Sequence, residues 1–229
     1  MKHIAILLAF LMTLSSPVVA QDFQKGFAAY NAGDYATALQ EWTPLAEAGD
    51  EVAQYNLAWM YDSGLGVPQD YKEAAKWYQL AADQGDADAQ INLGFMYKNG
   101  EGVPQDYKEA VKWYLLAADQ GYVSAQYNLG VMFNDGQDYK EAVKWYRLAV
   151  EQGFAEAQTN LGLMYENGQG VLQDNATAHM WYNIGAANGN KLGGTNRDRL
   201  AKQMTPADIS KAQAMARECM NSGYTKCGY

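Results

Sequence analysis

The sequence predicts an all-α protein in which antiparallel helix pairs stack into an elongated solenoid closed by a C-terminal capping pair. Three observations support this fold class. Residues 66–85 (GVPQDYKEAAKWYQLAADQG) and 102–121 (GVPQDYKEAVKWYLLAADQG) are identical at 18 of 20 positions. Apolar residues recur at helical spacing inside each copy, and helix-starting Asp and helix-ending Gly residues recur at fixed places. Units of this size cannot bury an apolar face alone, so neighbouring units must stack.

The first twenty residues are expected to be a secretory signal peptide rather than part of the fold. Lys2 supplies a short basic region, Ile4 to Leu14 are an apolar stretch too short to span a bilayer, and residues 17–20 offer small side chains for cleavage. We expect the mature protein to begin near Gln21. No later segment approaches ~18 consecutive apolar residues, so no stable membrane insertion is expected after cleavage.

The charge balance disfavours two classes of partner. The 229 residues carry 17 Lys and Arg against 26 Asp and Glu, and removing Lys2 with the signal peptide changes the net charge from -9 to -10. Such a chain repels nucleic-acid phosphates and anionic lipid surfaces. Residues 21–190 hold 9 basic and 23 acidic side chains, whereas residues 191–229 hold 7 and 3. This polarity indicates either a partner steered to one end or a differently built C-terminal cap.

Four units follow one another, each beginning at an Ala-Gln dipeptide. They cover residues 53–88, 89–124, 125–156 and 157–192, with lengths of 36, 36, 32 and 36. A degenerate unit precedes them at about 23–52. The third unit is short because Gly136-Gln137-Asp138 stands where its predecessor has the seven residues 100–106. These units define the predicted solenoid, residues 21–192.

Each unit is predicted to contain two helices. In the second unit the first helix runs from about Ala89 to Tyr97 and stops at Gly100. The second helix begins after Asp106, with Glu109 three residues later, so that each carboxylate can accept a bond from a free N–H of the first turn. It is closed near Gly121 by a left-handed turn. The same Asp and Glu recur at 70 and 73 and at 138 and 141.

Residues 193–229 depart from the repeat and are expected to cap it. A helix is predicted over Arg197–Met204, and a second one after Thr205, with Pro206 at its first position and Asp208 in its first turn. Cys219 and Cys227 lie eight residues apart in an exported chain, with turn-forming residues 221–223 between them. A disulfide is the expected state, with two free thiols or a metal-binding pair as the alternatives.

The repeat pattern A-Q-x-N-L-G-x-M-Y-x-x-G-x-G-V-x-x-D-Y-x-E-A-x-K-W-Y-x-x-A-A-x-x-G resembles the Sel1-like repeat, a relative of the tetratricopeptide repeat. The resemblance covers residues 53–192 strongly and 23–52 weakly. It implies a right-handed α-solenoid that serves as a scaffold for protein complexes, commonly in bacterial envelope and host-interaction proteins. We therefore expect a protein partner, of unspecified identity, and export to the periplasm or secretion.

Binding specificity should lie where the units differ on one helical face. The varying positions of the first helices are spaced i, i+4 and i+7 and should form four parallel stripes on a concave surface, aromatic toward the N-terminal end. The alternative is that these positions vary merely because they are exposed. The stripes are Tyr55, Trp59 and Asp62; Ile91, Phe95 and Lys98; Tyr127, Val131 and Asn134; and Thr159, Leu163 and Glu166.

A ladder of asparagines runs beside the stripes and consists of Asn56, Asn92, Asn128 and Asn160. A primary amide donates and accepts hydrogen bonds, as an extended peptide backbone requires. In peptide-binding tetratricopeptide domains, which these units resemble, an Asn at the matching place holds the ligand backbone. The alternative is a structural amide that satisfies a neighbouring turn.

The sequence offers little for catalysis. The single His of the mature chain, His179, takes the place of Ala75, Val111 and Val143 and is expected to be a packed helix residue. No nucleophile, phosphate-binding or metal-binding motif is present, so we expect no enzyme activity, cofactor or metal. Two alternatives to a noncatalytic scaffold remain: an envelope assembly factor, and a β-lactamase-like or other hydrolase, as described for cysteine-rich relatives. Those relatives carry a Cys pair in each repeat, which these units lack.

Overall fold

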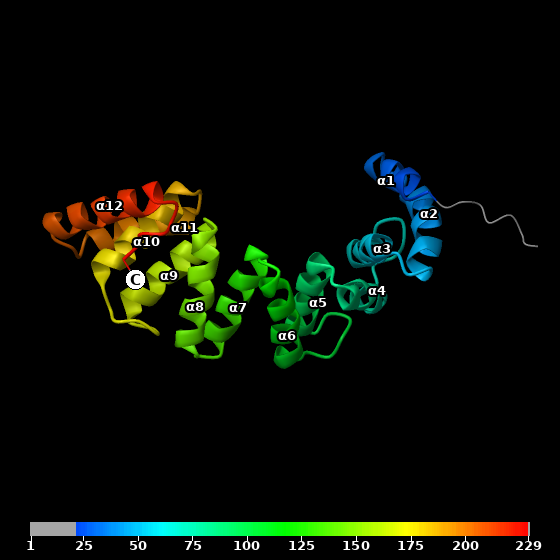
Figure 1. Cartoon of the computed structure of the whole chain (residues 1–229), viewed down its shortest axis with the longest axis horizontal. Helices are drawn as coiled ribbons and strands as arrows, with labels where there is room; N and C mark the ends of the chain where they lie inside the picture. The colour runs from blue at the N-terminus through cyan, green and yellow to red at the C-terminus, as the bar shows by residue number, and fades with distance from the viewer. Residues whose placement is uncertain (1–21, 229) are drawn as a thin grey trace, which may run out of the picture.

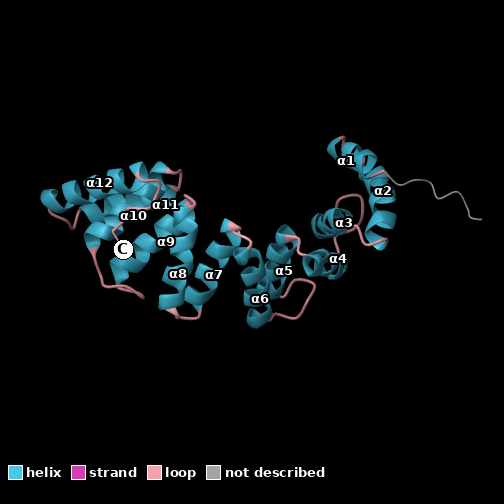
Figure 2. Cartoon of the chain, in the orientation of Figure 1, coloured by secondary structure: helices cyan, strands magenta, loops and turns pink. Residues whose placement is uncertain are grey.

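The computed structural model describes residues 22–228 as twelve α-helices, without a β-strand in that range (Figure 2). The helices follow one another along an arc whose two ends rise on the same side (Figure 1). The predicted signal peptide lies outside the described residues. In chain order the helices are α1 (Phe23–Asn31), α2 (Tyr35–Glu47), α3 (Glu51–Ser63), α4 (Tyr71–Gln84), α5 (Ala87–Asn99), α6 (Tyr107–Asp119), α7 (Val123–Asp135), α8 (Tyr139–Glu151), α9 (Ala155–Asn167), α10 (Asn175–Ala187), α11 (Lys191–Ala201) and α12 (Pro206–Asn221).

The stack is built from helix pairs that repeat one packing scheme. Within each pair from α1 and α2 to α9 and α10 the two helices pack together, and the second helix also packs on the first helix of the next pair. Small and large residues alternate at these contacts, because a buried Ala permits close approach and a buried Tyr one turn later fills the groove. The recurring pairs are Ala74 and Tyr78, Ala110 and Tyr114, Ala142 and Tyr146, and Ala178 and Tyr182.

The predicted helix ends are largely confirmed. Asp106 caps α6 by accepting hydrogen bonds from the backbone N–H groups of residues 108 and 109, and Gly100 ends α5 in the left-handed conformation, with φ 76°. Glu109 does not complete the cap as predicted, because its carboxylate accepts from the Lys112 ammonium at 3.0 Å. The helix predicted at 89–97 is longer, Ala87–Asn99, because Asp86 caps it from further upstream.

A chain of buried amides joins successive units. Gln90 of α5 donates to the carbonyl oxygen of Ala82 in α4 at 3.1 Å, and its own oxygen accepts from the Gln120 amide at the end of α6 at 3.0 Å. The bond recurs between Gln84 and Gln54 and between Gln152 and Gln126. The Gln54 and Gln90 amides each donate to an alanine carbonyl oxygen of the preceding unit, which connects those units, whereas the paired glutamines join the two helices of one unit.

The C-terminal cap differs from the prediction in its first helix. The helix predicted at 197–204 runs instead over Lys191–Ala201, because Asn190 caps it by accepting from the Gly193 N–H. Its first residue, Lys191, lies 36 residues after the first residue of α9, and the helix packs on α10, as the first helix of a further unit would. The predicted start of α12 is confirmed, with the Thr205 hydroxyl as its cap. This helix also packs on α10, and Leu200, Ala212 and Ala216 are buried.

Candidate protein-binding surface

An aromatic hollow opens at the N-terminal end of the stack. It has a volume of about 210 Å³ and is lined by Tyr55, Asn56 and Trp59 of α3 together with Phe27, Tyr30 and Trp42 of the degenerate first unit. Helix α1 lies tightly on α2 because Gly26 leaves room for the Trp42 ring; a Cβ at this glycine would lie 2.5 Å from the indole nitrogen. The Trp42 Nε1–H donates to the carbonyl oxygen of Phe23 at 3.2 Å, which fixes the floor of the hollow.

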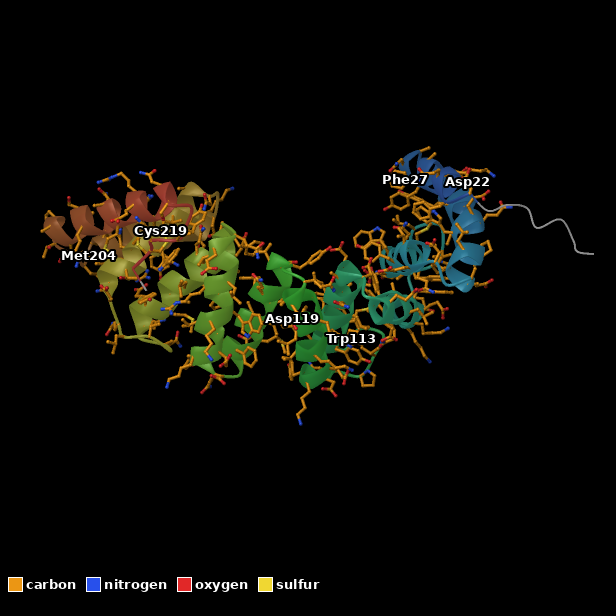
Figure 3. The ribbon with its side chains drawn as sticks, viewed as in Figure 1. Asp22, Phe27, Trp113, Asp119, Met204 and Cys219 are labelled. Atoms are coloured by element: carbon orange, nitrogen blue, oxygen red, sulfur yellow. A yellow bond between two sulfur atoms is a disulfide. The ribbon has the colours of Figure 1, made fainter. Side chains whose placement is uncertain are left out.

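The rim of the hollow consists of exposed aromatic side chains. Phe27 and Trp59 expose 48% and 40% of their surface, and the Trp59 Nε1–H donates to the Tyr30 hydroxyl at 3.0 Å. Phe95, which lies on α5 of the next unit, is 50% exposed. Figure 3 places Phe27 on the inner side of the arc. Exposed large aromatic residues gathered around a hollow mark a surface that suits a partner. The predicted positions 55, 56 and 59 thus lie together, whereas Phe27, Tyr30 and Trp42 were missed.

Apart from Phe95, the residues of the second and third stripes are less accessible. Ile91 and Val131 are half-buried against the core. The Tyr127 ring packs against those of Tyr146 and Phe154, with centroid distances of 6.1 and 5.1 Å. The exposed aromatic surface is therefore concentrated in the first units.

The fourth stripe is partly covered by the cap, contrary to the prediction of a surface across all four units. Thr159 is buried, and its hydroxyl donates to the carbonyl oxygen of Ala155. The Glu166 carboxylate accepts two hydrogen bonds of 2.7 Å from the Arg199 guanidinium of α11 and one of 2.7 Å from the Tyr182 hydroxyl. The Arg199 contact lowers the pKa of Glu166. Of this stripe, Leu163 remains exposed.

Two members of the asparagine ladder contact tyrosines of the preceding unit. The Asn160 amide donates to the Tyr146 hydroxyl at 3.2 Å. Two repeats earlier, Asn92 interacts with the Tyr55 hydroxyl and so opposes the rise in tyrosine pKa that burial causes. These contacts favour a structural role at 92 and 160. Asn56 lines the aromatic hollow, and all four ladder residues stay half-buried.

The N-terminal part of this surface is acidic. Burial and the neighbouring Glu101 carboxylate raise the pKa of Asp62, and burial also raises the pKa of Asp86 on the adjoining turn. The pKa of Tyr55 is raised by burial and by Asp88. Lys98 is the basic member of the predicted stripes. A partner with basic side chains would therefore complement this end of the arc.

The described part of the chain has no cluster of side chains typical of a metal centre. Within residues 22–228 no three His, Cys, Asp or Glu side chains gather where they could hold a metal ion. His179 is buried as predicted, and burial lowers its pKa. The sulfur atoms of Cys219 and Cys227 lie at disulfide distance. Over the same range no helix has both the length and the apolar character needed to cross a membrane.

Comparisons with known proteins identify the fold. The chain is similar to a Sel1 repeat protein from Oxalobacter formigenes, with 32% identity over 89% of this chain and 78% of that one and a TM-score of 0.68. It is also similar to c5321, a protective antigen of uropathogenic Escherichia coli strains displaying an SLR fold, with 31% identity and a TM-score of 0.76. That match covers 88% of this chain but only 45% of c5321. No curated protein matches the sequence.

The family model called Sel1 repeat matches residues 52–86, 87–122, 123–154 and 155–190. These four segments make up more than half of the chain and coincide with helices α3 to α10. Together with the stacked helix pairs and their connecting amides, this match establishes that the chain belongs to the Sel1 repeat family.

Proposed function

We propose that this protein is a noncatalytic scaffold that binds a protein or an extended peptide segment on the inner surface formed by α1, α3 and α5. Sel1 repeat proteins generally serve as scaffolds for protein interaction. The observation that carries the proposal is the aromatic hollow with its exposed Phe27 and Trp59, together with the exposed Phe95 of the next unit. Aromatic residues of this kind dominate the energetics of protein interfaces.

The chemistry of the surface favours a partner with apolar anchors and basic flanks. A hollow of about 210 Å³ is small and suits one or two side chains rather than a folded domain. The surrounding carboxylates of Asp62, Asp86 and Asp88 attract Lys and Arg. Asn56 offers an amide beside the hollow, where the backbone of such a segment would pass.

We further propose that the mature protein acts in the periplasm or after secretion. The sequence features of residues 1–20 support export. The positions of Cys219 and Cys227 support a disulfide, which persists in oxidising compartments. The test is fractionation of cells that express the full chain, with mass spectrometry of the product. Cleavage near Gln21 and recovery outside the cytoplasm are expected; an uncleaved cytoplasmic protein would overturn this part.

The binding proposal is tested with a matched pair of double variants of residues 21–229. Trp59→Ala with Phe95→Ala removes two exposed aromatic residues of the first helices, whereas Leu80→Ala with Leu116→Ala removes leucines of similar exposure from the second helices. Partners captured from a periplasmic extract are purified and titrated against each protein. We expect at least about tenfold weaker binding by the aromatic variant and unchanged binding by the leucine variant. Equal affinities for both variants would refute the proposed surface.

A further inference from the structure

The loops inside the units pack on the unit before them. A glycine with positive φ lies in each long loop and presses on the first turn of the preceding second helix. A Cβ at Gly102 would overlap the carbonyl oxygen of Tyr71, so this contact requires glycine. The residue that follows, Val103, is half-buried against the core. The three contacts of this kind are Gly66 on Tyr35, Gly102 on Tyr71 and Gly170 on Tyr139.

The third unit lacks this loop, and the site that would receive it is open. Only residues 136–138 connect α7 to α8, so no glycine lies over the first turn of α6. Tyr107, the first residue of α6, is 57% exposed, against 38% for Tyr71. Their orientations are comparable, because each hydroxyl accepts from the glutamine two residues earlier, at 3.1 and 3.0 Å. The missing loop therefore accounts for the greater exposure.

A cavity of about 650 Å³ lies at this open site. Tyr107 and Val111 of α6 and Met132 and Phe133 of α7 supply its apolar lining. Its charged lining consists of Lys98 and Lys108 together with Asp135 and Asp138. The corresponding groove between α4 and α5 measures about 410 Å³, and there Gly102 and Val103 form part of the wall. The receiving surface has been kept while the segment that fills it elsewhere has been lost.

We propose that this cavity binds a turn of a partner protein with the sequence acidic residue, glycine, aliphatic residue. Glycine follows from the contact made at Gly102, and the aliphatic residue follows from the half-buried Val103. The partner turn would take the place of the loop that the chain itself supplies in the neighbouring units, such as Gly102 and Val103.

The acidic residue follows from charge. In the second unit Glu101 precedes the glycine and acts electrostatically on Asp62 of the unit before it. The position equivalent to Asp62, 36 residues later, is Lys98. An acidic residue before the bound glycine would therefore lie beside a lysine. Neither Lys98 nor Lys108 forms an ion pair within residues 22–228, so both ammonium groups are available to a partner.

This second site is independent of the aromatic surface and is tested separately. The probe is a fluorescein-labelled peptide, NGEGVPQDY, which copies residues 99–107. Control peptides carry alanine for the central glycine (NGEAVPQDY) or lysine for the glutamate (NGKGVPQDY). Binding to residues 21–229 is followed by fluorescence anisotropy up to 1 mM peptide. We expect saturable binding of the probe, with about tenfold weaker binding of the alanine peptide, because the required positive φ disfavours a Cβ.

Two protein variants complete the test. Insertion of Glu-Gly-Val-Pro after Gly136 restores the loop of the second unit and should abolish peptide binding. Lys98→Glu should weaken the probe about fivefold while improving the NGKGVPQDY peptide. Trp59→Ala should leave the affinity unchanged, which separates this site from the aromatic surface.

The proposal is overturned if the wild-type protein shows no saturable binding at 1 mM, if the three peptides bind equally, or if the loop-restored protein binds as well as the wild type. Sedimentation of the wild-type and loop-restored proteins adds an arm for self-association. A dimer formed only by the wild type would identify a second copy as the occupant and would also overturn the proposal of a foreign partner.

Discussion

Removal of the buried Gln90 amide should lower the free energy of unfolding by an amount that follows from the hydrogen bonds it makes. Gln90→Leu deletes one hydrogen bond to the Ala82 carbonyl oxygen and one from the Gln120 amide. Each such bond contributes about 0.5–1.5 kcal/mol net. The Ala82 carbonyl oxygen keeps a bond from the Gly85 N–H, and Gln120 is exposed enough to bind water. We therefore expect the lower part of the range, a loss of about 1–2 kcal/mol in the free energy of unfolding.

A double-mutant cycle isolates this contact. Urea unfolding of residues 21–229, followed by helical circular dichroism, is measured for wild type, Gln90→Leu, Gln120→Leu and the double variant. Both single variants lose the same amide bond, so the double variant should be less destabilised than their sum by about 0.5–1.5 kcal/mol. Gln79→Leu, which alters a surface amide bonded to Asp83, serves as the control and should change stability by less than about 0.5 kcal/mol.

The comparison requires equal m-values, since a changed m-value would show that the units no longer unfold together. Additivity of the two single variants within about 0.3 kcal/mol would refute the claim that the paired amides of Gln90 and Gln120 stabilise each other.

Three further predictions concern the cap and the loops. The free energy of unfolding should fall as pH decreases below about 4.5, because the folded state holds the pKa of Glu166 below that ordinary value; urea titrations at pH 3–6 should show this loss reduced in Glu166→Gln. Gly102→Ala should cost at least about 1 kcal/mol more than Gly121→Ala in the same assay, since both glycines have positive φ but only the first Cβ would overlap backbone; equal costs would contradict the loop packing. Reduction should destabilise the cap by up to about 2.5 kcal/mol for the loop between Cys219 and Cys227, with no such effect in the double Ala variant.

The fold could be predicted because the sequence contains several copies of one two-helix unit. Each copy repeats the helix-starting Asp and the helix-ending Gly, so the helix ends predicted in one unit can be compared with the aligned positions of the next unit. The α11 helix lies mostly beyond the aligned units, so its ends could not be compared in this way. Its predicted start, Arg197, is too late and lies after the pair Gly193 and Gly194. The structure gives the reason for the first glycine: a Cβ at Gly193 would lie 2.9 Å from the Thr159 hydroxyl and 3.0 Å from the Tyr182 carbonyl oxygen.

The candidate surface was predicted in part for the same reason. The units can be aligned from α3 onward. Positions 55 and 59 vary between units and Asn56 is constant, so the helix face that carries them could be identified. Phe27 and Tyr30 lie in the degenerate first unit, where alignment with the other copies is weak. The available signal was the density of aromatic residues over 23–42, which exceeds what the packing of one small helix pair requires.

Variation between units is evidence of a free surface only where nothing else covers the position. Thr159 differs from Tyr55 and Tyr127 yet is buried, because α11 occupies the place of the next unit. Its variation reflects a new neighbour rather than a ligand.

The shortened third unit shows the opposite case. The first turn of α6 keeps the sequence Tyr-Lys-Glu of the turn of α4 on which Gly102 packs. The loop contact made at Tyr71 is absent at Tyr107, although the Tyr107 hydroxyl keeps its bond from the Gln105 amide. A receiving site that retains its residues after losing its internal occupant is what a binding site for an external turn requires. Constancy of a helix turn that has lost its internal loop therefore points to the cavity beside Tyr107, as variation with exposure points to Trp59 and Phe95.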